Sequence, residues 1–314
     1  MKALRQRQRG VAILAAMLIV VLATIIAVNL AWRQALDLRR FDSAIATDQG
    51  MLFLQGGEAW AGDILRQDLV DSPDSDNLGE QWATELPPLP MEVDGRTVGT
   101  ITGKLEDLQG RFNINTLIDR RGREDPLALR QFERLLQRLD LDPTLAGGVV
   151  DWLDPDTEQR FPEGGEDAAY ADTDPQYRTA NAAITTPTEL MAVARFDRET
   201  YTKLAPYITV LPLGTKINVN TASAVVLSSL SDDIDVSTAE SLVEQRNGGA
   251  FLDIGATFSG MVEPDMLKRI DGVTQYFLLT ATVTLGTNQL TMRSVLQRDA
   301  SGLTRAVFRN LGVE

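Results

Sequence analysis

The first 32 residues divide into a charged leader and an uncharged, mostly apolar stretch. The leader, residues 1–10, ends at Gly10, and the stretch from Val11 to Trp32 contains no charged side chain. At about 1.5 Å of helical rise per residue, this stretch reaches roughly 33 Å, enough to cross a hydrocarbon core of about 30 Å. A secretory signal peptide has a shorter apolar region, of about 7–15 residues. The pattern therefore predicts a transmembrane helix over residues 11–32 behind a leader that is removed.

The leader also predicts the orientation of the chain. Cationic flanks of a membrane span stay on the cytoplasmic side. The cations are Lys2, Arg5, Arg7 and Arg9. We therefore expect the N-terminus in the cytoplasm and everything after Trp32 outside it.

Helical periodicity continues from Ala35 to Val70. Apolar residues recur there among Arg, Asp and Gln at a spacing that places one helix face against a soluble core. Gly50 and Gly56–Gly57 mark positions where the helix bends or is closely approached. The run Ser72–Asp76 ends the pattern, so we expect one long helix that is first membrane-embedded and then packed on a domain.

Apolar and polar residues alternate as in β-strands in two regions of the chain. These are the C-terminal part of residues 33–115 and residues 274–314. After a Pro-rich connector, Leu86–Pro90, the pair Asp94-Gly95 lies between two β-prone runs and predicts a hairpin turn. The chain end predicts an antiparallel meander. Its expected strands are Tyr276–Leu285, Gln289–Gln297 and Ala306–Phe308, with a turn at Gly286–Asn288.

Residues 116–273 have a different texture, with helical periodicity in three places. These are Leu127–Leu139, Thr188–Ala194 and Thr238–Arg246. The fold class predicted for the chain is therefore α+β. A long N-terminal helix packs on a small antiparallel sheet, and a large all-helical domain is inserted between strands.

Composition limits the chemistry of this chain. It has no cysteine and no histidine, which removes Cys/His zinc sites, thiol nucleophiles and Ser-His-Asp triads. A carboxylate-only or Ser-Lys enzyme is the alternative that these absences leave open, and we expect no enzyme. The net charge of −14 also opposes phosphate binding, which requires clustered Lys and Arg.

An apolar-Asn-apolar-Asn-Thr pattern occurs twice, at Phe112–Thr116 and at Ile217–Thr221. Asn and Thr accept hydrogen bonds from the first turn of a helix, so each copy predicts a helix start. The second copy begins a stretch, through Phe251, that resembles the helix-hairpin-helix module of DNA-uptake receptors. In that module a Gly-apolar-Gly hairpin approaches phosphate, whereas here the hairpin reads Asp233-Ile234-Asp235, so we expect no nucleic-acid partner.

An acidic segment runs from Asp151 to Asp174, with nine carboxylates and the single cation Arg160. Its prolines and glycines predict a loop, and hard oxygen ligands on a loop suit calcium, which accepts six to eight of them. A solvated acidic loop is the alternative. Neighbouring aromatic residues indicate partial burial, which favours a bound cation that staples a chain without disulfides. The candidate ligands are Asp151, Asp154, Asp156, Glu163, Glu166, Asp167, Asp172 and Asp174.

Together these features resemble the minor pseudopilin K family of the type II secretion system. The resemblance covers nearly the whole chain. It rests on the leader ending in Gly10, the apolar anchor, Gly110–Asn115, Asp151–Asp154, Gly165–Asp167 with Tyr170, Tyr177–Asn181 and Glu189-Leu190. The family resemblance implies a pseudopilin helix and sheet with a large helical insertion, with which calcium has been associated. It also implies that prepilin peptidase cuts after Gly10 and methylates Val11, and that the protein is anchored in the inner membrane with its bulk in the periplasm.

One departure from ordinary pseudopilins concerns their Glu at the fifth mature position, where this chain has Ala15. A carboxylate in the apolar core of a filament is costly unless it pairs with a neighbour's N-terminal ammonium. A subunit without that Glu suits the start of a filament, and the family resemblance likewise implies a position at the pseudopilus tip. The alternative is that the protein is a monomeric anchored domain, in which Ala15 is simply a small apolar residue of the membrane helix.

The predicted function is thus a tip subunit that initiates or caps the pseudopilus in protein export. The predicted partners are the minor pseudopilins H, I and J, with the insertion directed towards the secretion channel or exported substrates. The alternative is a membrane-anchored helix-hairpin-helix binding module of the DNA-uptake type.

Overall fold

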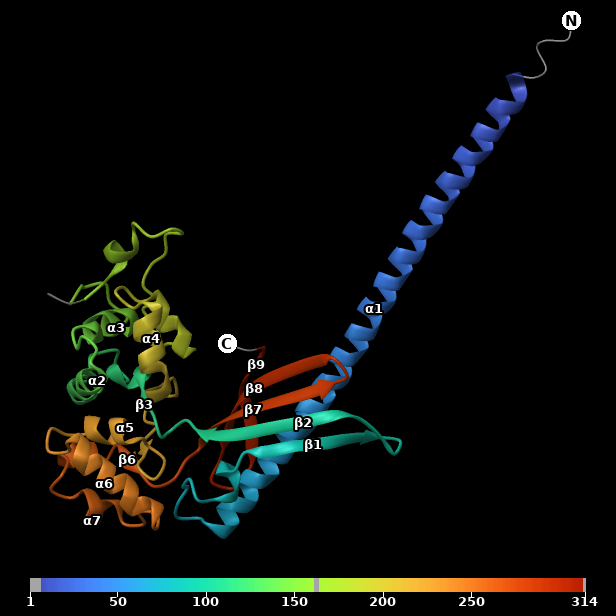
Figure 1. The fold of residues 1–314 in the computed structure, drawn as a ribbon. Coiled ribbons are helices and arrows are strands. Elements are labelled where there is room, and N and C mark those ends of the chain that lie inside the picture. The colour runs from blue at the N-terminus through green and yellow to red at the C-terminus, as the bar shows by residue number, and fades with distance from the viewer. Residues whose placement is uncertain (1–6, 161–163, 313–314) are drawn as a thin grey trace, which may run out of the picture.

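One helix, α1 (Arg7–Asp71), determines the elongated shape of the molecule. Its N-terminal part projects away from the rest of the chain, and its C-terminal part lies across a sheet (Figure 1). The computed structural model describes residues 7–160 and 164–312. The prediction of a single long helix is confirmed, and the helix ends where the polar run Ser72–Asp76 begins.

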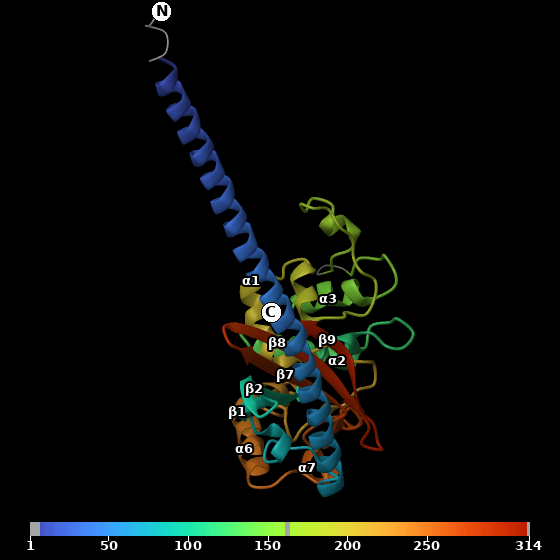
Figure 2. The same ribbon diagram turned by 90° about the vertical axis from the view of Figure 1, so that its right-hand side faces the viewer.

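The sheet has five antiparallel strands in the order β1-β2-β7-β8-β9. β2 and β7 are neighbours although the whole insertion separates them in sequence (Figures 1 and 2). The predicted α+β class is confirmed. The strands are β1 (Leu86–Val93), β2 (Arg96–Asp107), β7 (Tyr276–Leu285), β8 (Asn288–Arg298) and β9 (Thr304–Leu311).

Turn signals predicted this sheet with one error. Asp94 and Gly95 have φ of 50° and 73° and join β1 to β2, as expected for a tight hairpin, and the predicted C-terminal meander is confirmed. The error is Leu86–Pro90, which is no connector but the first part of β1. β1 is an edge strand, and an edge tolerates proline because one side of the strand needs no ladder hydrogen bonds.

Helix and sheet share one apolar core. Alternate residues of β7, from Phe277 to Leu285, face α1, where Leu54 and Leu65 are fully buried. Gly57 permits a close approach, since a Cβ there would lie 2.9 Å from Ile101 Cδ1. Each buried Leu or Phe contributes about 1.5–3 kcal/mol, so this face determines which side of α1 meets the sheet.

The insertion, residues 108–275, forms two lobes with separate apolar cores beside the sheet (Figure 1). The first lobe contains β3 (Phe112–Asn113), η2 (Ile114–Leu117), α2 (Pro126–Arg138), α3 (Leu145–Leu153), η3 (Asp167–Tyr170), η4 (Pro187–Ala192), α4 (Arg198–Leu204), η5 (Ala205–Tyr207) and β4 (Ile208–Thr209). The second contains β5 (Ile217–Asn218), α5 (Ala224–Ser229), α6 (Val236–Asn247), α7 (Ile254–Phe258), α8 (Pro264–Leu267) and β6 (Ile270–Asp271). A further 3-10 helix, η1 (Gln81–Ala83), packs beside α1.

The insertion is not purely helical, which corrects one detail of the prediction. Each lobe begins and ends with a two-residue strand, and the two strands pair in parallel, β3 with β4 and β5 with β6. These strands are too short to show alternation in the sequence. The predicted helix at Thr188–Ala194 is the 3-10 helix η4.

The repeated Asn-x-Asn motif closes each lobe. In the first, Asn115 accepts from the amide of Ile184 at 2.9 Å and donates to its carbonyl at 3.0 Å. In the second, Asn220 makes the same pair with Phe251, at 2.8 and 3.2 Å. The prediction that both copies cap helices is therefore half right: Asn113 caps η2, but the cap of α5 is Ser223.

Candidate functional site

Three of the predicted metal ligands meet just beyond the C-terminal end of α3. A ligand oxygen from each of Asp154, Asp156 and Glu166 lies within 4.8 Å of the others. Asp154 is the C-cap of α3, and Glu166 immediately precedes η3, so two short elements bring the carboxylates together. We refer to Asp154, Asp156, Glu166 and Asn181 as the loop cluster.

Asn181 belongs to this cluster because its Nδ2 donates to the Asp156 carbonyl at 2.8 Å. Three buried oxygens of the cluster have no hydrogen-bond partner among the described residues: Asp154 Oδ1, Glu166 Oε1 and Asn181 Oδ1. Leaving a buried polar atom unpaired costs about 1–3 kcal/mol, and more if it is charged. Three such oxygens on residues of one loop cluster call for a positively charged partner.

The pKa values of the acids in and beside the loop cluster also indicate a positively charged partner. Burial, followed by the nearby charges of Asp156, Asp151 and Glu166, raises the pKa of Asp154 to about 7. Burial also raises the pKa of Glu166 and that of Asp151. The loop cluster therefore resists full ionisation near neutral pH unless a cation joins it.

The donor set fits calcium. All of its free ligand atoms are carboxylate or amide oxygens, the hard ligands that Ca²⁺ prefers, and they lie on an irregular loop. Zinc favours the nitrogen of His and the sulfur of Cys as ligands, and the chain contains neither residue.

The remaining candidates have other contacts. Asp151 is buried, and its Oδ2 accepts from the Arg160 amide at 3.0 Å, so it shapes the loop. Asp167 accepts from Thr179. Asp172 and Asp174 are exposed and lie outside the loop cluster. Glu163 lies outside the described residues.

Asn181 was not predicted as a ligand because it is uncharged and lies beyond the acidic segment, which ends at Asp174. Its side-chain amide carries an oxygen that suits a hard cation, and its φ of 45° is a left-handed conformation that Asn adopts more readily than most residues. The left-handed backbone cannot be recognised in the sequence, so Asn181 could be identified as a ligand only from the structure.

Aromatic side chains support the loop cluster from the core of the first lobe. The rings of Trp152 and Tyr170 meet edge to face with centroids 5.4 Å apart, and Tyr177 lies 5.1 Å from Tyr170. The Tyr170 hydroxyl accepts from the Ala194 amide at 3.1 Å. These contacts hold the acidic segment against the lobe and explain its partial burial.

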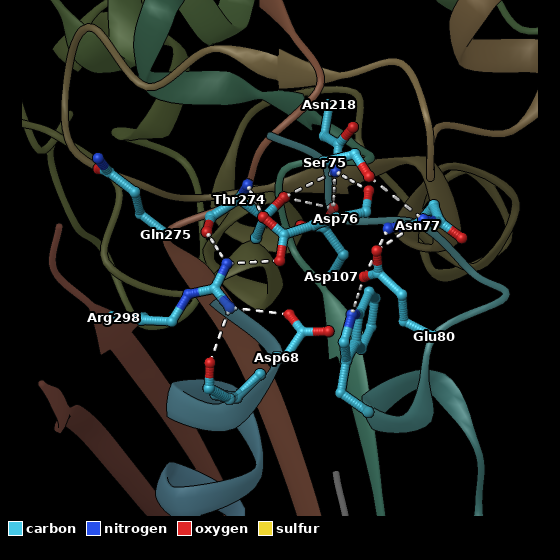
Figure 3. Close-up of polar contacts among 12 residues, drawn as sticks. Asp68, Ser75, Asp76, Asn77, Glu80, Asp107, Asn218, Thr274, Gln275 and Arg298 are labelled. Carbon is cyan, nitrogen blue, oxygen red and sulfur yellow. Dashed lines mark hydrogen bonds and ion pairs between the residues drawn. The ribbon is translucent and has the colours of Figure 1, made fainter. Parts of the chain in front are cut away.

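A second acidic group joins the insertion to the pseudopilin domain, and we call it the junction (Figure 3). Arg298, at the end of β8, is 3% exposed. Its Nη1 donates to Asp68 Oδ2 and to the Leu65 carbonyl, each at 2.9 Å, and its Nη2 donates to Asp76. One guanidinium therefore bridges two buried carboxylates, one in the last turn of α1 and one just after the helix, and burial followed by the nearby charge of Glu80 raises the pKa of Asp68 to about 7.

Asp107 extends the junction into the second lobe. Its Oδ2 accepts from Asn218 at 2.9 Å, from Thr221 at 2.5 Å and from Thr274 at 2.6 Å. Burial raises the pKa of Asp107 to about 6, although the three donors lower it. Asn218 also donates to the Asp76 carbonyl at 2.9 Å. The repeated Asn motif of the second lobe is thus part of its attachment.

From Val11 onward, the N-terminal part of α1 projects away from the rest of the described chain (Figure 1). Its apolar window has a mean hydropathy of 3.1 and is 0% buried, long and apolar enough to cross a membrane. Val11 and Leu14 are each 67% exposed, and Ala15 is exposed as well. Gly10 lies in α1, and its burial is not described.

The helix-hairpin-helix region forms α5, a turn and α6. Ile234 is fully buried in the turn, Asp235 caps α6 through the Thr238 amide, and Asp233 is exposed. Asp232, next to them, pairs with Arg134 of α2 at 2.8 Å. The hairpin therefore presents carboxylates and docks against the first lobe.

The two lobes match the comparison with known families. Two family models described as "Type II secretion system (T2SS), protein K" match residues 110–213 and 217–265, one in each lobe. The protein of Pseudomonas aeruginosa described as "Type II secretion system protein K" is 31% identical over 98% of this chain and 94% of its own length. The chain belongs to the type II secretion system protein K family. A protein K of Aeromonas hydrophila is 30% identical over 93% of this chain and 94% of its own length.

A solved structure shares the fold of this protein K family member. It is a chain of "the GspK-GspI-GspJ complex from enterotoxigenic Escherichia coli", with a TM-score of 0.77 and 24% identity. The match covers 88% of this chain and 100% of the other. Protein K is a structural pseudopilin component of the secretion system, so this chain is a minor pseudopilin and not an enzyme.

Proposed function

We propose that this minor pseudopilin stands at the tip of the periplasmic pseudopilus, where it initiates or caps assembly. The observation that carries the proposal is the combination of Ala15 with a two-lobed insertion beside the sheet (Figures 1 and 2). A subunit without a carboxylate at that position cannot pair with the terminal ammonium of a subunit beyond it. The insertion adds bulk that a helically packed shaft has little room to accommodate.

The partners in this proposal are minor pseudopilins of the H, I and J types. The structural relative comes from a complex of K, I and J proteins, which supports this choice. The part of α1 between membrane and sheet supplies a surface for them, because Leu38, Phe41 and Leu52 are each 65–68% exposed. Apolar side chains exposed along one helix are typical of a helix that packs on others.

Assembly is tested by co-purification from membranes that contain the full set of minor pseudopilins. Phe41→Asp should reduce capture of the I-type and J-type subunits, since it places a charge on the exposed helix surface. The matched control is Leu252→Asp, at a position 73% exposed on the second lobe. Equal capture by both variants would count against assembly through α1.

The proposal includes processing and orientation. The leader cations hold the N-terminus in the cytoplasm, prepilin peptidase removes residues 1–10, and Val11 becomes the methylated N-terminus, with the bulk of the chain in the periplasm. Intact mass of the membrane-extracted protein tests this directly. Loss of Met1 to Gly10, with one added methyl group, is the expected result, and an uncleaved chain would contradict the processing step.

Calcium completes the proposal as a structural ion. Asp154, Asp156, Glu166 and Asn181 would hold it, and the three unpaired buried oxygens support this assignment. The ion would supply positive charge that fixes the acidic loop on the first lobe. Chelation should therefore lower the melting temperature of the full chain, and an unchanged melting temperature would refute the assignment.

A further inference from the structure

The junction contains more acids than its arginine can neutralise. Ligand oxygens of Asp68, Asp76 and Glu80 lie within 4.8 Å of one another. Asp76 is 1% exposed, Asp68 is buried as well, and Glu80 is partly buried. Arg298 pairs with the two aspartates and has no ion pair with Glu80 in the described part of the chain (Figure 3). If every acid were ionised, three negative charges would share one positive charge.

Glu80 has uncharged donors of its own. Its carboxylate accepts from the Asn77 amide at 3.0 Å, from Asn77 Nδ2 at 2.6 Å and from Trp82 Nε1 at 2.7 Å (Figure 3). Asn and Trp bind the carboxylate without cancelling its charge. The excess negative charge of the junction is therefore not removed at Glu80.

The contact between Asp68 and Asp76 shows where a proton can compensate this excess. Their carboxyl groups are hydrogen-bonded to each other. An ionised carboxylate only accepts hydrogen bonds, so this contact requires a proton on one of the two groups. Asp76 already receives Arg298 Nη2 and the Thr274 amide, whereas Asp68 receives Arg298 Nη1. The proton therefore belongs on Asp68, which has fewer donors.

Asp76 is also the residue that ties the insertion to the end of α1. Its amide donates to the Gly272 carbonyl at 2.9 Å, and its Oδ2 accepts from the Thr274 amide at 2.6 Å. Its carbonyl accepts from Asn218 of the second lobe at 2.9 Å. The apolar cluster that joins insertion and sheet is small, with the buried residues Leu108, Leu211, Tyr276 and Leu278. The orientation of the insertion thus depends on the polar contacts of Asp76.

The charged groups that face Asp68 are Arg298 from β8, Glu80 from η1 and Asp76 from the turn after α1. On α1 itself the neighbouring charges are exposed and bonded within the helix. The second lobe contributes neutral donors, and the next acid of the junction, Asp107 of β2, accepts from such donors.

The sign of the pH dependence follows from these neighbours. Burial, followed by the charge of Glu80, raises the pKa of Asp68 from its ordinary value of 3.8 to about 7. The stabilising contribution of its proton is therefore complete below about pH 4 and is lost as the pH rises through 7.

We propose that the junction is a pH-dependent switch, which fixes the insertion on the pseudopilin domain while a proton is shared between Asp68 and Asp76. When that proton passes to solvent, two adjacent carboxylates repel each other. Asp76 then moves away from Asp68 and loosens its bonds to Gly272, Thr274 and Asn218. The insertion thereby changes its orientation relative to α1.

The test measures the distance between α1 and the second lobe in the full chain in detergent micelles. The chain has no cysteine, so Gln55→Cys and Leu252→Cys, both at exposed positions, can carry a pair of spin labels. The distance distribution should be narrow at about pH 5 and should broaden or shift by about pH 9, with a midpoint near pH 7. An unchanged distribution would overturn the proposal.

Variants in the labelled chain identify the acid that is responsible. Asp68→Asn is neutral at every pH and keeps an oxygen for Arg298, so it should retain the narrow distribution at both pH values. The matched control is Asp63→Asn, an exposed acid of the same helix, which should change with pH as the wild type does. A wild-type response in Asp68→Asn would overturn the proposal.

A second control keeps the test decisive if Asp68→Asn does not fold. Asp154→Asn removes the acid of the loop cluster whose pKa is also about 7, and it should retain the wild-type change in distance. Loss of the change in Asp154→Asn or in Asp63→Asn would place the switch outside the junction and overturn the proposal.

Discussion

The junction and the loop cluster are two groups of buried acids that solve the same problem differently. At the junction, Asp68 and Asp76 both pair with the Arg298 guanidinium, and none of these three side chains has a buried polar atom without a partner in the described part of the chain. In the loop cluster, Asp154 and Glu166 have no arginine beside them and keep unpaired oxygens. The difference teaches that the chain supplies an arginine to the buried acids that attach two domains, whereas no described arginine pairs with the acids of the loop cluster.

The consequence concerns what each region depends on. A cation fixed in the sequence cannot dissociate, so Arg298 stays at the junction whatever ions the solution contains. A cation taken from solution can be removed, so the loop cluster depends on the composition of its surroundings. Removing Arg298 from the junction and calcium from the loop cluster tests this contrast.

The largest effect is expected from Arg298→Met. It leaves two buried carboxylates without their partner, which costs about 3–5 kcal/mol of unfolding free energy. Denaturant unfolding of the full chain in detergent measures it. The control is Arg66→Met, which breaks an exposed ion pair with Asp63 and should cost less than about 1 kcal/mol. Similar costs for the two variants would remove the special role of the junction.

The second largest effect is expected from calcium removal. Calcium at one hundred times its dissociation constant contributes about 2.7 kcal/mol, which chelation should abolish. Arg298→Met should show the same calcium-dependent shift as the wild type, because the two regions share no partner and distant sites add independently. A shift confined to the wild type would mean that the junction itself responds to the ion.

The third effect is a pH dependence that only calcium-free protein should show. The folded pKa of Asp154, about 7, lies above its ordinary value of 3.8, so its stabilising contribution is complete below about pH 4 and is lost as the pH rises through 7. Discounted for solvent exposure, the loss is on the order of 1 kcal/mol. Asp154→Asn should remove this part of the dependence, and the difference between the two melting curves isolates it from Asp68 and Asp107, whose pKa values are raised as well. A dependence unchanged in the variant would contradict the assignment to Asp154.

The smallest effect is expected from Asn181→Gly. Glycine accepts the left-handed backbone but removes one neutral ligand, so calcium affinity should fall about fivefold. Asp172→Asn, an exposed acid of the same loop, is the control and should leave the affinity unchanged. Calcium titration by calorimetry compares them, and equal affinities would exclude Asn181 from the ion's ligands.

What could be predicted depended on how local the signal is. The extent of α1, the Asp94-Gly95 hairpin and the C-terminal meander follow from periodicity and turn chemistry within a few residues. The strand at Leu86–Pro90 was missed because its prolines are acceptable only at an edge, and edge position is a property of the assembled sheet.

The two acidic groups show the same limit. The three acids of the loop cluster could be predicted from one acidic segment, although the rest of that segment does not converge and Asn181 was not predicted. The junction could not, because Arg298 meets Asp68 across 230 positions of sequence and no spacing rule connects them.

The adjacency of β2 and β7 has a consequence for the order in which the chain folds. Asp107 lies opposite Phe277, so the sheet closes only after the entire insertion has been made. Synthesis proceeds at about 5–20 residues per second, so the apolar face of α1 stays exposed for tens of seconds before the sheet can cover it. The lobes have cores of their own and need not wait. The domain that begins first in the sequence is therefore the last to be completed, and its apolar helix face is exposed to chaperones or aggregation for longest.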